Sequence, residues 1–76
     1  MTSLIIDSSD FASRIPENLS NIRKQQRYTQ KAIADLAGVD PNYYAKIERG
    51  EGVPSLKTLY KIAKALNVSI TDIVGY

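Results

Sequence analysis

The apolar residues of this chain recur at helical spacing, and no segment shows the alternation expected of a strand. A first amphipathic helix is predicted near residues 14–26, where one face carries Ile15, Leu19, Ile22 and Gln26. Ser13 is suited to its N-cap, and Pro16 suits the first turn, where its missing N–H needs no acceptor. Residues 1–9 have no helical period and are expected to form a flexible or loosely packed arm.

Two short helices are predicted next, joined by a three-residue turn. Thr29 caps the first, over residues 30–37, and Gly38 ends it with a left-handed residue. Asp40 and the proline after it begin the second, which runs from residue 41 to about residue 49 and stops at a glycine. The apolar residues expected to face inward from the first of these helices are Ile33, Leu36 and Ala37.

The strongest apolar stripe of the chain predicts a fourth helix, between Ser55 at its N-cap and Asn67 at its end. The stripe consists of Leu56, Leu59, Tyr60, Ala63 and Leu66. Ser69 and Asp72 form a capping-box-like pair that opens a last short helix. Five helices, short loops and no strand signal indicate an all-α fold.

The composition narrows the possible chemistry. The 76 residues include no cysteine and no histidine, which removes disulfides, thiolate metal sites and the commonest general base. No pairing of carboxylates suggests a catalytic site. We therefore expect a protein that is not an enzyme, with no metal, cofactor or small-molecule ligand.

Basic residues are concentrated in the body of the chain. Residues 14–64 hold all ten Lys and Arg against five Asp and Glu, a net charge of +10 − 5 = +5. This excess suits a polyanionic partner, although on charge alone a soluble surface with a mild cationic excess is the preferred interpretation. No signal peptide and no membrane span are apparent, so a cytoplasmic, nucleoid-associated protein is expected.

The segment from about 30 to 49 fits a helix-turn-helix, in which two short helices meet steeply across a glycine turn. Ala34 must be small because the helices cross close to it. Gly38 must take a positive φ, and Val39 fills the space beneath the turn. The apolar residues placed to close the small core between these helices are Ile33, Tyr44 and Ile47.

A resemblance to the Cro/repressor family of bacteria and phages covers Thr29 to Val74, TQKAIADLAGVDPNYYAKIERGEGVPSLKTLYKIAKALNVSITDIV, and extends back through IRKQQRYTQ to Ile22. The joint pattern TQ, IA, AGV, IERG, PSL and ALNVS is highly specific. It implies a compact, five-helix, lambda-repressor-like domain over residues 13–76, after an N-terminal arm of residues 1–12. The implied function is sequence-specific binding of double-stranded DNA by a bacterial or phage-encoded transcriptional regulator, a repressor or an activator.

The resemblance also implies DNA-contacting residues. Gln30 matches a glutamine that reaches a phosphate and braces the recognition helix, and residues 41–49 match that helix. Of its exposed positions, Asn42 is expected to pair with adenine and Lys46 with guanine. Tyr43 is expected to touch a thymine methyl or a phosphate, or else to lie on the helix surface and pack against the loop at Gly50.

The resemblance also implies further phosphate contacts and a structural ion pair. The amides that open the fourth helix are expected to clamp a phosphate, with help from a lysine side chain; these residues are Ser55, Leu56 and Lys57. Arg23 and Glu48 match a largely buried ion pair that fixes how the recognition helix docks. Three residues depart from the family: Arg27 at a left-handed glycine position, Pro16, and Tyr44 in place of an aliphatic residue that belongs to the core.

One such domain covers half an operator, so a homodimer on a palindromic site is expected. The apolar C-terminus suggests the dimer surface, formed by Ile73, Val74 and Tyr76, unless these residues only complete the monomer core. PNYYAKIERG also resembles restriction–modification controller proteins. The alternative function is a protein–protein adaptor that keeps the fold without DNA binding, but an adaptor is expected to have lost Gln30, Lys46 and the phosphate clamp.

Overall fold

The computed structural model describes the backbone of residues 8–75 and the side chains of residues 14–75. Over this range the chain folds into helices and short loops without a strand, which confirms the all-α prediction. The elements are α1 (Ser8–Gln25), α2 (Gln30–Ala37), α3 (Pro41–Glu48), α4 (Leu56–Leu66) and α5 (Ile70–Val74). None of the described helices is both long and apolar enough to cross a membrane.

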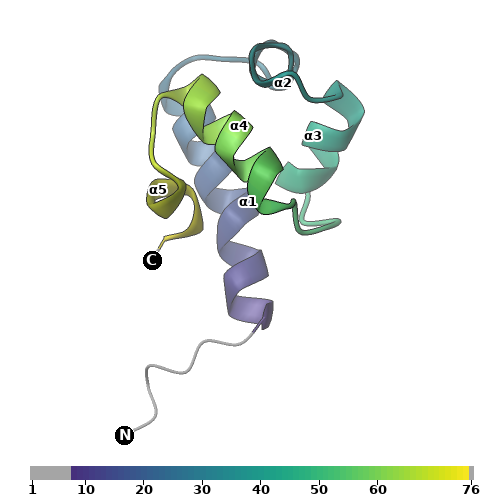
Figure 1. The fold of residues 1–76 in the computed structure, drawn as a ribbon, viewed down its shortest axis with the longest axis vertical. Coiled ribbons are helices and arrows are strands. Elements are labelled where there is room, and N and C mark those ends of the chain that lie inside the picture. The colour runs from purple at the N-terminus through teal and green to yellow at the C-terminus, as the bar shows by residue number, and fades with distance from the viewer. Residues whose placement is uncertain (1–7, 76) are drawn as a thin grey trace, which may run out of the picture.

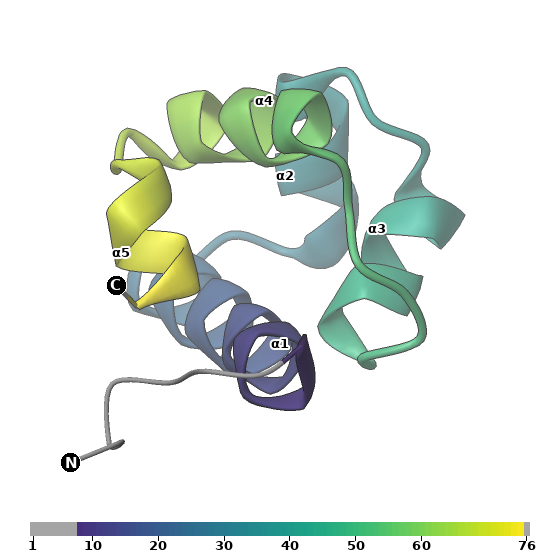
Figure 2. The ribbon, with the colours of Figure 1, turned by 60° about the horizontal axis from the view of Figure 1, so that its bottom comes forward.

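The helices surround a single core. Figures 1 and 2 show α1 and α4 on opposite sides of that core, with α5 at one edge and α3 at the other. The core residues are Ile15, Leu19, Ile33, Ala34, Ala37, Tyr44, Ile47, Leu59, Ile62, Ala63, Leu66 and Ile73. Two amide side chains, one on α1 and one in the turn after it, extend this packing: Asn18 Nδ2 donates to the carbonyl of Ile73 (2.8 Å), and Gln26 Nε2 donates to that of Leu66 (2.8 Å).

The start of α1 was predicted wrongly. The helix begins at Ser8 rather than near residue 14, so Ser13 lies within it and Pro16 is in its interior. An interior proline removes one N–H donor and crowds the carbonyl four residues earlier, yet the helix continues on its N-terminal side. Residues 8–12 of the predicted arm are therefore helical, while residues 1–7 lie outside the described part of the chain.

Apart from Ser13, the predicted N-caps are confirmed. The side chains of Thr29, Asp40 and Ser55 each accept a hydrogen bond from the N–H three residues later. Ser69 and Asp72 form a reciprocal capping box. Left-handed residues end helices at Gly38, Asn67 and Gly75, and Arg27 takes a positive φ of 64° in the turn after α1.

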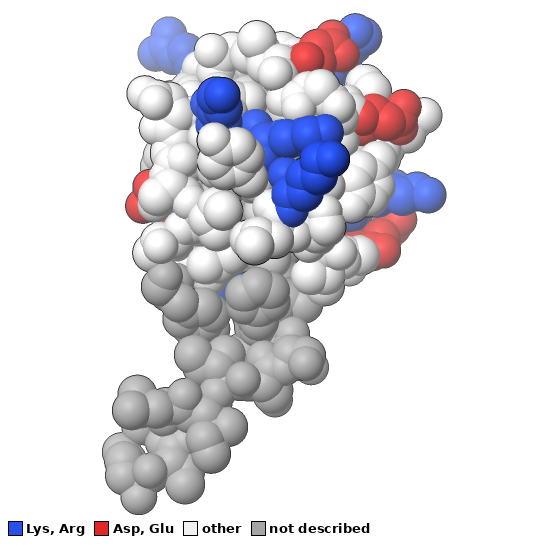
Figure 3. All heavy atoms as spheres, in the orientation of Figure 1, with Lys and Arg blue, Asp and Glu red and all other residues white. Residues whose placement is uncertain are grey.

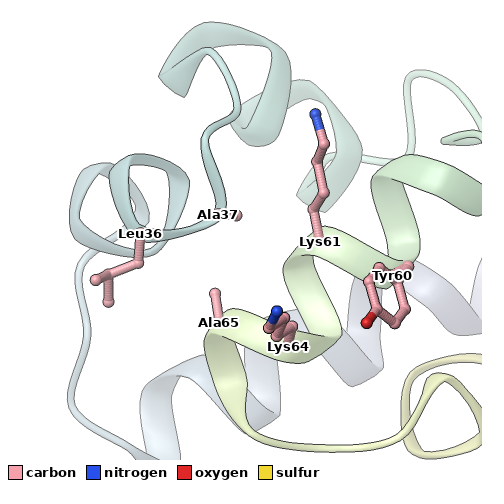
Figure 4. A pocket seen from close by; sticks show the side chains of 6 residues that line it. All are labelled: Leu36, Ala37, Tyr60, Lys61, Lys64 and Ala65. Carbon is pink, nitrogen blue, oxygen red and sulfur yellow. The ribbon is translucent and has the colours of Figure 1, made fainter.

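Three apolar residues assigned to the inward faces are exposed instead: Leu36 (61%), Leu56 (70%) and Tyr60 (57%). In α4 the buried face is centred on Leu59 and Ile62, which turns Tyr60 outward. In α2 the buried residues leave Leu36 at the edge of the apolar face. Figure 4 shows Leu36 and Tyr60 lining an open hollow between α2 and α4, together with Ala37, Ala65 and two lysines.

Candidate nucleic-acid interface

The turn between α2 and α3 has the geometry required of a helix-turn-helix. Gly38 adopts φ 72°, and the N–H of Val39 donates to the carbonyl of Ala34 (2.9 Å). Ala34 is fully buried, which allows the helices to approach closely, and Val39 packs against the core. The requirements that the sequence placed on these three residues are therefore met.

Helix α3 has one buried face and one exposed face. Tyr44 and Ile47 are buried in the core, with 0% and 1% exposure. Asn42, Tyr43 and Lys46 are all exposed, and their backbone is fixed at its start by the Asp40 carboxylate, which accepts the Tyr43 N–H at 3.0 Å. The three residues predicted to read bases thus share a helix surface that is accessible to a large ligand.

Three polar side chains surround Glu48 at the end of α3. Oε2 of Glu48 accepts hydrogen bonds from Arg23 Nε (2.7 Å) and from the Tyr44 hydroxyl (2.5 Å). Oε1 accepts from Arg23 Nη2 (3.0 Å) and from Gln30 Nε2 (3.0 Å). The predicted ion pair is present, with side chains only 11% and 5% exposed, and it joins α3 to α1.

The electrostatics of this cluster favour its charged state. Burial raises the pKa of Glu48, but the hydrogen bonds from Arg23, Tyr44 and Gln30 outweigh it, so the net pKa lies below its ordinary value. The hydrogen bond to Glu48 raises the pKa of Arg23 despite burial. Burial and the neighbouring carboxylate raise the pKa of Tyr44, which keeps its hydroxyl protonated as a donor.

Gln30 is placed where it can brace the recognition helix, as predicted, because its amide contacts Glu48 on α3. Its phosphate contact stays a prediction. The role of the Tyr44 hydroxyl was missed, since the sequence indicated only a bulky core residue. The available signal was the i, i+4 spacing of Tyr44 and Glu48, which places the two side chains on one helix face.

The N-terminus of α4 presents N–H groups without intrahelical acceptors, as the first turn of any helix does. Ser55 Oγ accepts the Thr58 N–H at 3.1 Å, while the amides of Leu56 and Lys57 remain available for an anion. Ser55, Leu56 and Lys57 are exposed. The phosphate clamp predicted here has a suitable geometry and stays a prediction.

Basic side chains gather on the same part of the surface. Helix α4 carries three exposed lysines, Lys57, Lys61 and Lys64. Figure 3 shows Lys and Arg gathered over the part of this face where α4 runs, with the acidic side chains mainly toward its rim. Within the described residues, no group of three or more Cys, His, Asp or Glu could hold a metal ion.

The predicted dimer surface needs a correction. Ile73 has 0% exposure and belongs to the monomer core, because α5 packs its single buried residue against the other helices. Val74 is half-buried and also packs against the core, while Tyr76 lies outside the described residues.

Comparison with known proteins also indicates a helix-turn-helix domain. The helix-turn-helix family model HTH_3 matches residues 19–73. The transcriptional repressor RstR of the cryptic phage CTXphi from Vibrio cholerae is 44% identical over 62 residues, which cover 82% of this chain and 55% of the repressor. The chain thus spans about half the length of that relative. Its name describes a regulator, in agreement with the prediction that the chain is not an enzyme.

Two solved structures share the fold. An HTH_3 family transcriptional regulator from Vibrio cholerae superposes with a TM-score of 0.80 and 38% identity, over 86% of this chain and 36% of that protein. The restriction–modification controller protein C.AhdI from Aeromonas hydrophila gives a TM-score of 0.78 and 25% identity, over 88% of this chain and 98% of the controller. With its turn geometry, buried ion pair and sequence match in agreement, the chain belongs to the HTH_3 helix-turn-helix family.

Proposed function

We propose that this domain binds double-stranded DNA in a sequence-specific manner and regulates transcription. The observation that carries the proposal is the division of α3: one face is fixed in the core, and the other exposes Asn42, Tyr43 and Lys46. An α-helix fits the major groove, where base edges present distinct patterns of donors and acceptors. A rigidly held helix with an exposed polar face is suited to reading them.

The three exposed residues have complementary chemistry. The Asn42 amide can form a bidentate pair with adenine, and the Lys46 ammonium can donate to guanine. Tyr43 can contact a thymine methyl or a phosphate. Because each side chain is exposed and none bonds to another described side chain, all three are available to DNA without first breaking an internal bond.

Phosphate contacts would set the register of the helix in the groove. Gln30 at the start of α2 and the first-turn amides of α4 at Ser55, Leu56 and Lys57 are suited to this task. The lysines farther along α4 add positive potential without reading bases.

We also propose that two copies bind a palindromic operator, with half-sites centred about one helical turn, ~34 Å, apart. A single small domain gives limited contact area, and tight specific binding generally requires two. Val74 and Tyr76 remain the proposed contacts from the C-terminal segment, without Ile73.

Selection of bound sequences from random duplex DNA tests the proposal. We expect enrichment of a two-fold motif, and sedimentation of the protein at tens of micromolar with that duplex should show two copies per DNA. Failure to enrich any sequence would favour the adaptor function instead. A monomer in every condition would contradict the dimer while leaving DNA binding intact.

A further inference from the structure

The hydroxyl group of Tyr44 has a polar partner inside an apolar core. The Tyr44 side chain has 0% exposure, and its hydroxyl donates to Glu48 Oε2 at 2.5 Å, one helical turn along α3. A buried aromatic residue used only for packing needs no hydroxyl, because phenylalanine fills nearly the same volume. The hydroxyl therefore acts on the carboxylate.

The Glu48 carboxylate receives a complete set of donors. Each oxygen accepts two hydrogen bonds: Oε2 from Arg23 and Tyr44, and Oε1 from Arg23 and Gln30. In addition, Arg23 Nη1 donates to the Tyr28 carbonyl at 2.7 Å, which holds the guanidinium against the turn that leads into α2. Every buried side-chain polar atom of the described residues has a hydrogen-bond partner, so the cluster is fully satisfied as it stands.

The position of Gln30 depends on this carboxylate. Gln30 is the first residue of α2 and is half-buried, and its one side-chain hydrogen bond within the described chain goes to Glu48 Oε1. One proton of its amide group and its carbonyl oxygen remain for other ligands. The orientation of Glu48 thus determines which way the rest of the Gln30 amide faces.

We infer that Tyr44 is a positioning residue for DNA binding, whose hydroxyl orients Glu48 and, through Glu48, the Gln30 amide that contacts a phosphate. Without the hydroxyl, Oε2 retains Arg23 as its only donor, and the carboxylate turns toward the guanidinium. Oε1 then moves relative to Gln30, although Tyr44 and Gln30 share no hydrogen bond. The inference rests on the proposed DNA binding, but its structural part can be tested without DNA.

The first test is a double-mutant cycle on a duplex selected from random DNA. We expect Tyr44→Phe and Gln30→Ala each to weaken binding by about tenfold, and the double variant to lose about tenfold rather than a hundredfold, because both changes remove one contact. A hundredfold loss in the double variant would show independent effects and overturn the inference. Tyr60→Phe is the matched control, since that tyrosine is exposed and makes no hydrogen bond through its hydroxyl within the described chain.

The second test uses NMR of the free protein and needs no folded Tyr44 variant. In wild-type protein the buried Tyr44 hydroxyl proton should exchange slowly and give its own resonance. We expect Gln30→Ala to shift this resonance and Lys31→Ala, at the next and exposed position, to leave it in place. An unchanged resonance in Gln30→Ala would overturn the coupling, whereas a wild-type protein that binds no duplex would contradict the proposed function alone.

Discussion

Both faces of α3 carry polar side chains, but on one face they are buried and on the other they are exposed to solvent. On the buried face, Glu48 receives four hydrogen bonds from side chains of three helices. On the exposed face, Asn42 and Lys46 form no side-chain hydrogen bond or ion pair within the described residues, although the Lys46 charge helps to lower the pKa of Glu51. One face therefore fixes the helix and the other is left to contact a ligand. Changes on the buried face should alter stability, and should alter recognition only through the position of Glu48 and Gln30, whereas changes on the exposed face should alter recognition directly.

The ion pairs of the domain show the same contrast. The Arg23–Glu48 pair has side chains 11% and 5% exposed, whereas Lys31–Asp35 has side chains 74% and 55% exposed. Arg49 and Glu51 form a similarly exposed pair at the end of the recognition helix. Exposed pairs contribute little, while removing one partner of a buried pair leaves an uncompensated charge. Burial, more than the distance between the charged atoms, determines which ion pair affects the stability of the domain.

The largest effect should come from Arg23→Ala, which leaves Glu48 buried without its cation. We expect a loss of about 3–5 kcal/mol in the free energy of unfolding, enough to unfold much of a small domain. Urea denaturation followed by circular dichroism measures it. Arg49→Ala is the matched control and should leave the denaturation midpoint nearly unchanged, and replacing Arg23 and Glu48 together by apolar residues should restore part of the loss. Equal midpoints for Arg23→Ala and wild type would contradict the ion-pair role.

Selective recognition should depend on Asn42, which has no part in the buried cluster. Asn42→Ala should weaken binding to the selected duplex by about 1–3 kcal/mol, with little change on scrambled DNA and in thermal stability. Titrations of the variant on both duplexes give the two free energies. An equal loss on both would make Asn42 a backbone contact and remove it from base readout.

Acid should lower the free energy of unfolding through Glu48, on the buried face of α3. Its folded pKa lies below the unfolded value of about 4.5, because the donors of the cluster outweigh the cost of burial. The unfolded state therefore binds the proton more readily, so the contribution of Glu48 is complete above about pH 4.5 and decreases as the pH falls through the folded pKa. Unfolding free energies measured from pH 6 to pH 2 should fall less steeply in Glu48→Gln than in wild type. Identical slopes would show that Glu48 does not contribute to the acid sensitivity.

The smallest effect should come from Lys57, an exposed residue at the start of α4. Lys57→Ala should weaken binding to selected and scrambled duplexes alike and reduce the slope of log affinity against log salt by about 1, because a phosphate contact releases counterions without reading bases. Lys24→Ala, on the exposed surface of α1, is the control and should not change the slope. A loss confined to the selected duplex would assign Lys57 to base readout.

Local chemistry predicted the helices and their ends well. Thr29, Asp40 and Gly38 act through atoms three to five residues away, so their roles can be predicted from neighbouring sequence. Periodicity identified apolar stripes but not their centres, which depend on the helices packed against them, and Leu36 and Tyr60 were assigned to the wrong side. The helical residues before Pro16 were missed because proline is typical of a first turn.

In the candidate site, too, the sequence did not predict the contacts that depend on packing between helices. A family resemblance supplied Arg23 and Glu48, which are 25 residues apart in the chain. It could not supply the hydroxyl of Tyr44, because this chain has an aromatic residue where the family usually has an aliphatic one. The donors of that cluster come from separate helices, and their convergence is visible only once the chain is folded.

The hydrogen bond from Asn18 to the Ile73 carbonyl joins residues 55 positions apart, so it can form only late in synthesis. Helix α1 leaves the ribosome early, at about 5–20 residues per second, but α5 is the last helix of the domain to emerge. Helix α1 packs against α5, so until α5 emerges α1 lacks part of its cover and the nascent chain is open to proteases and chaperones. A chain that stops before Ser69 should therefore lack this closing contact and should not complete the fold.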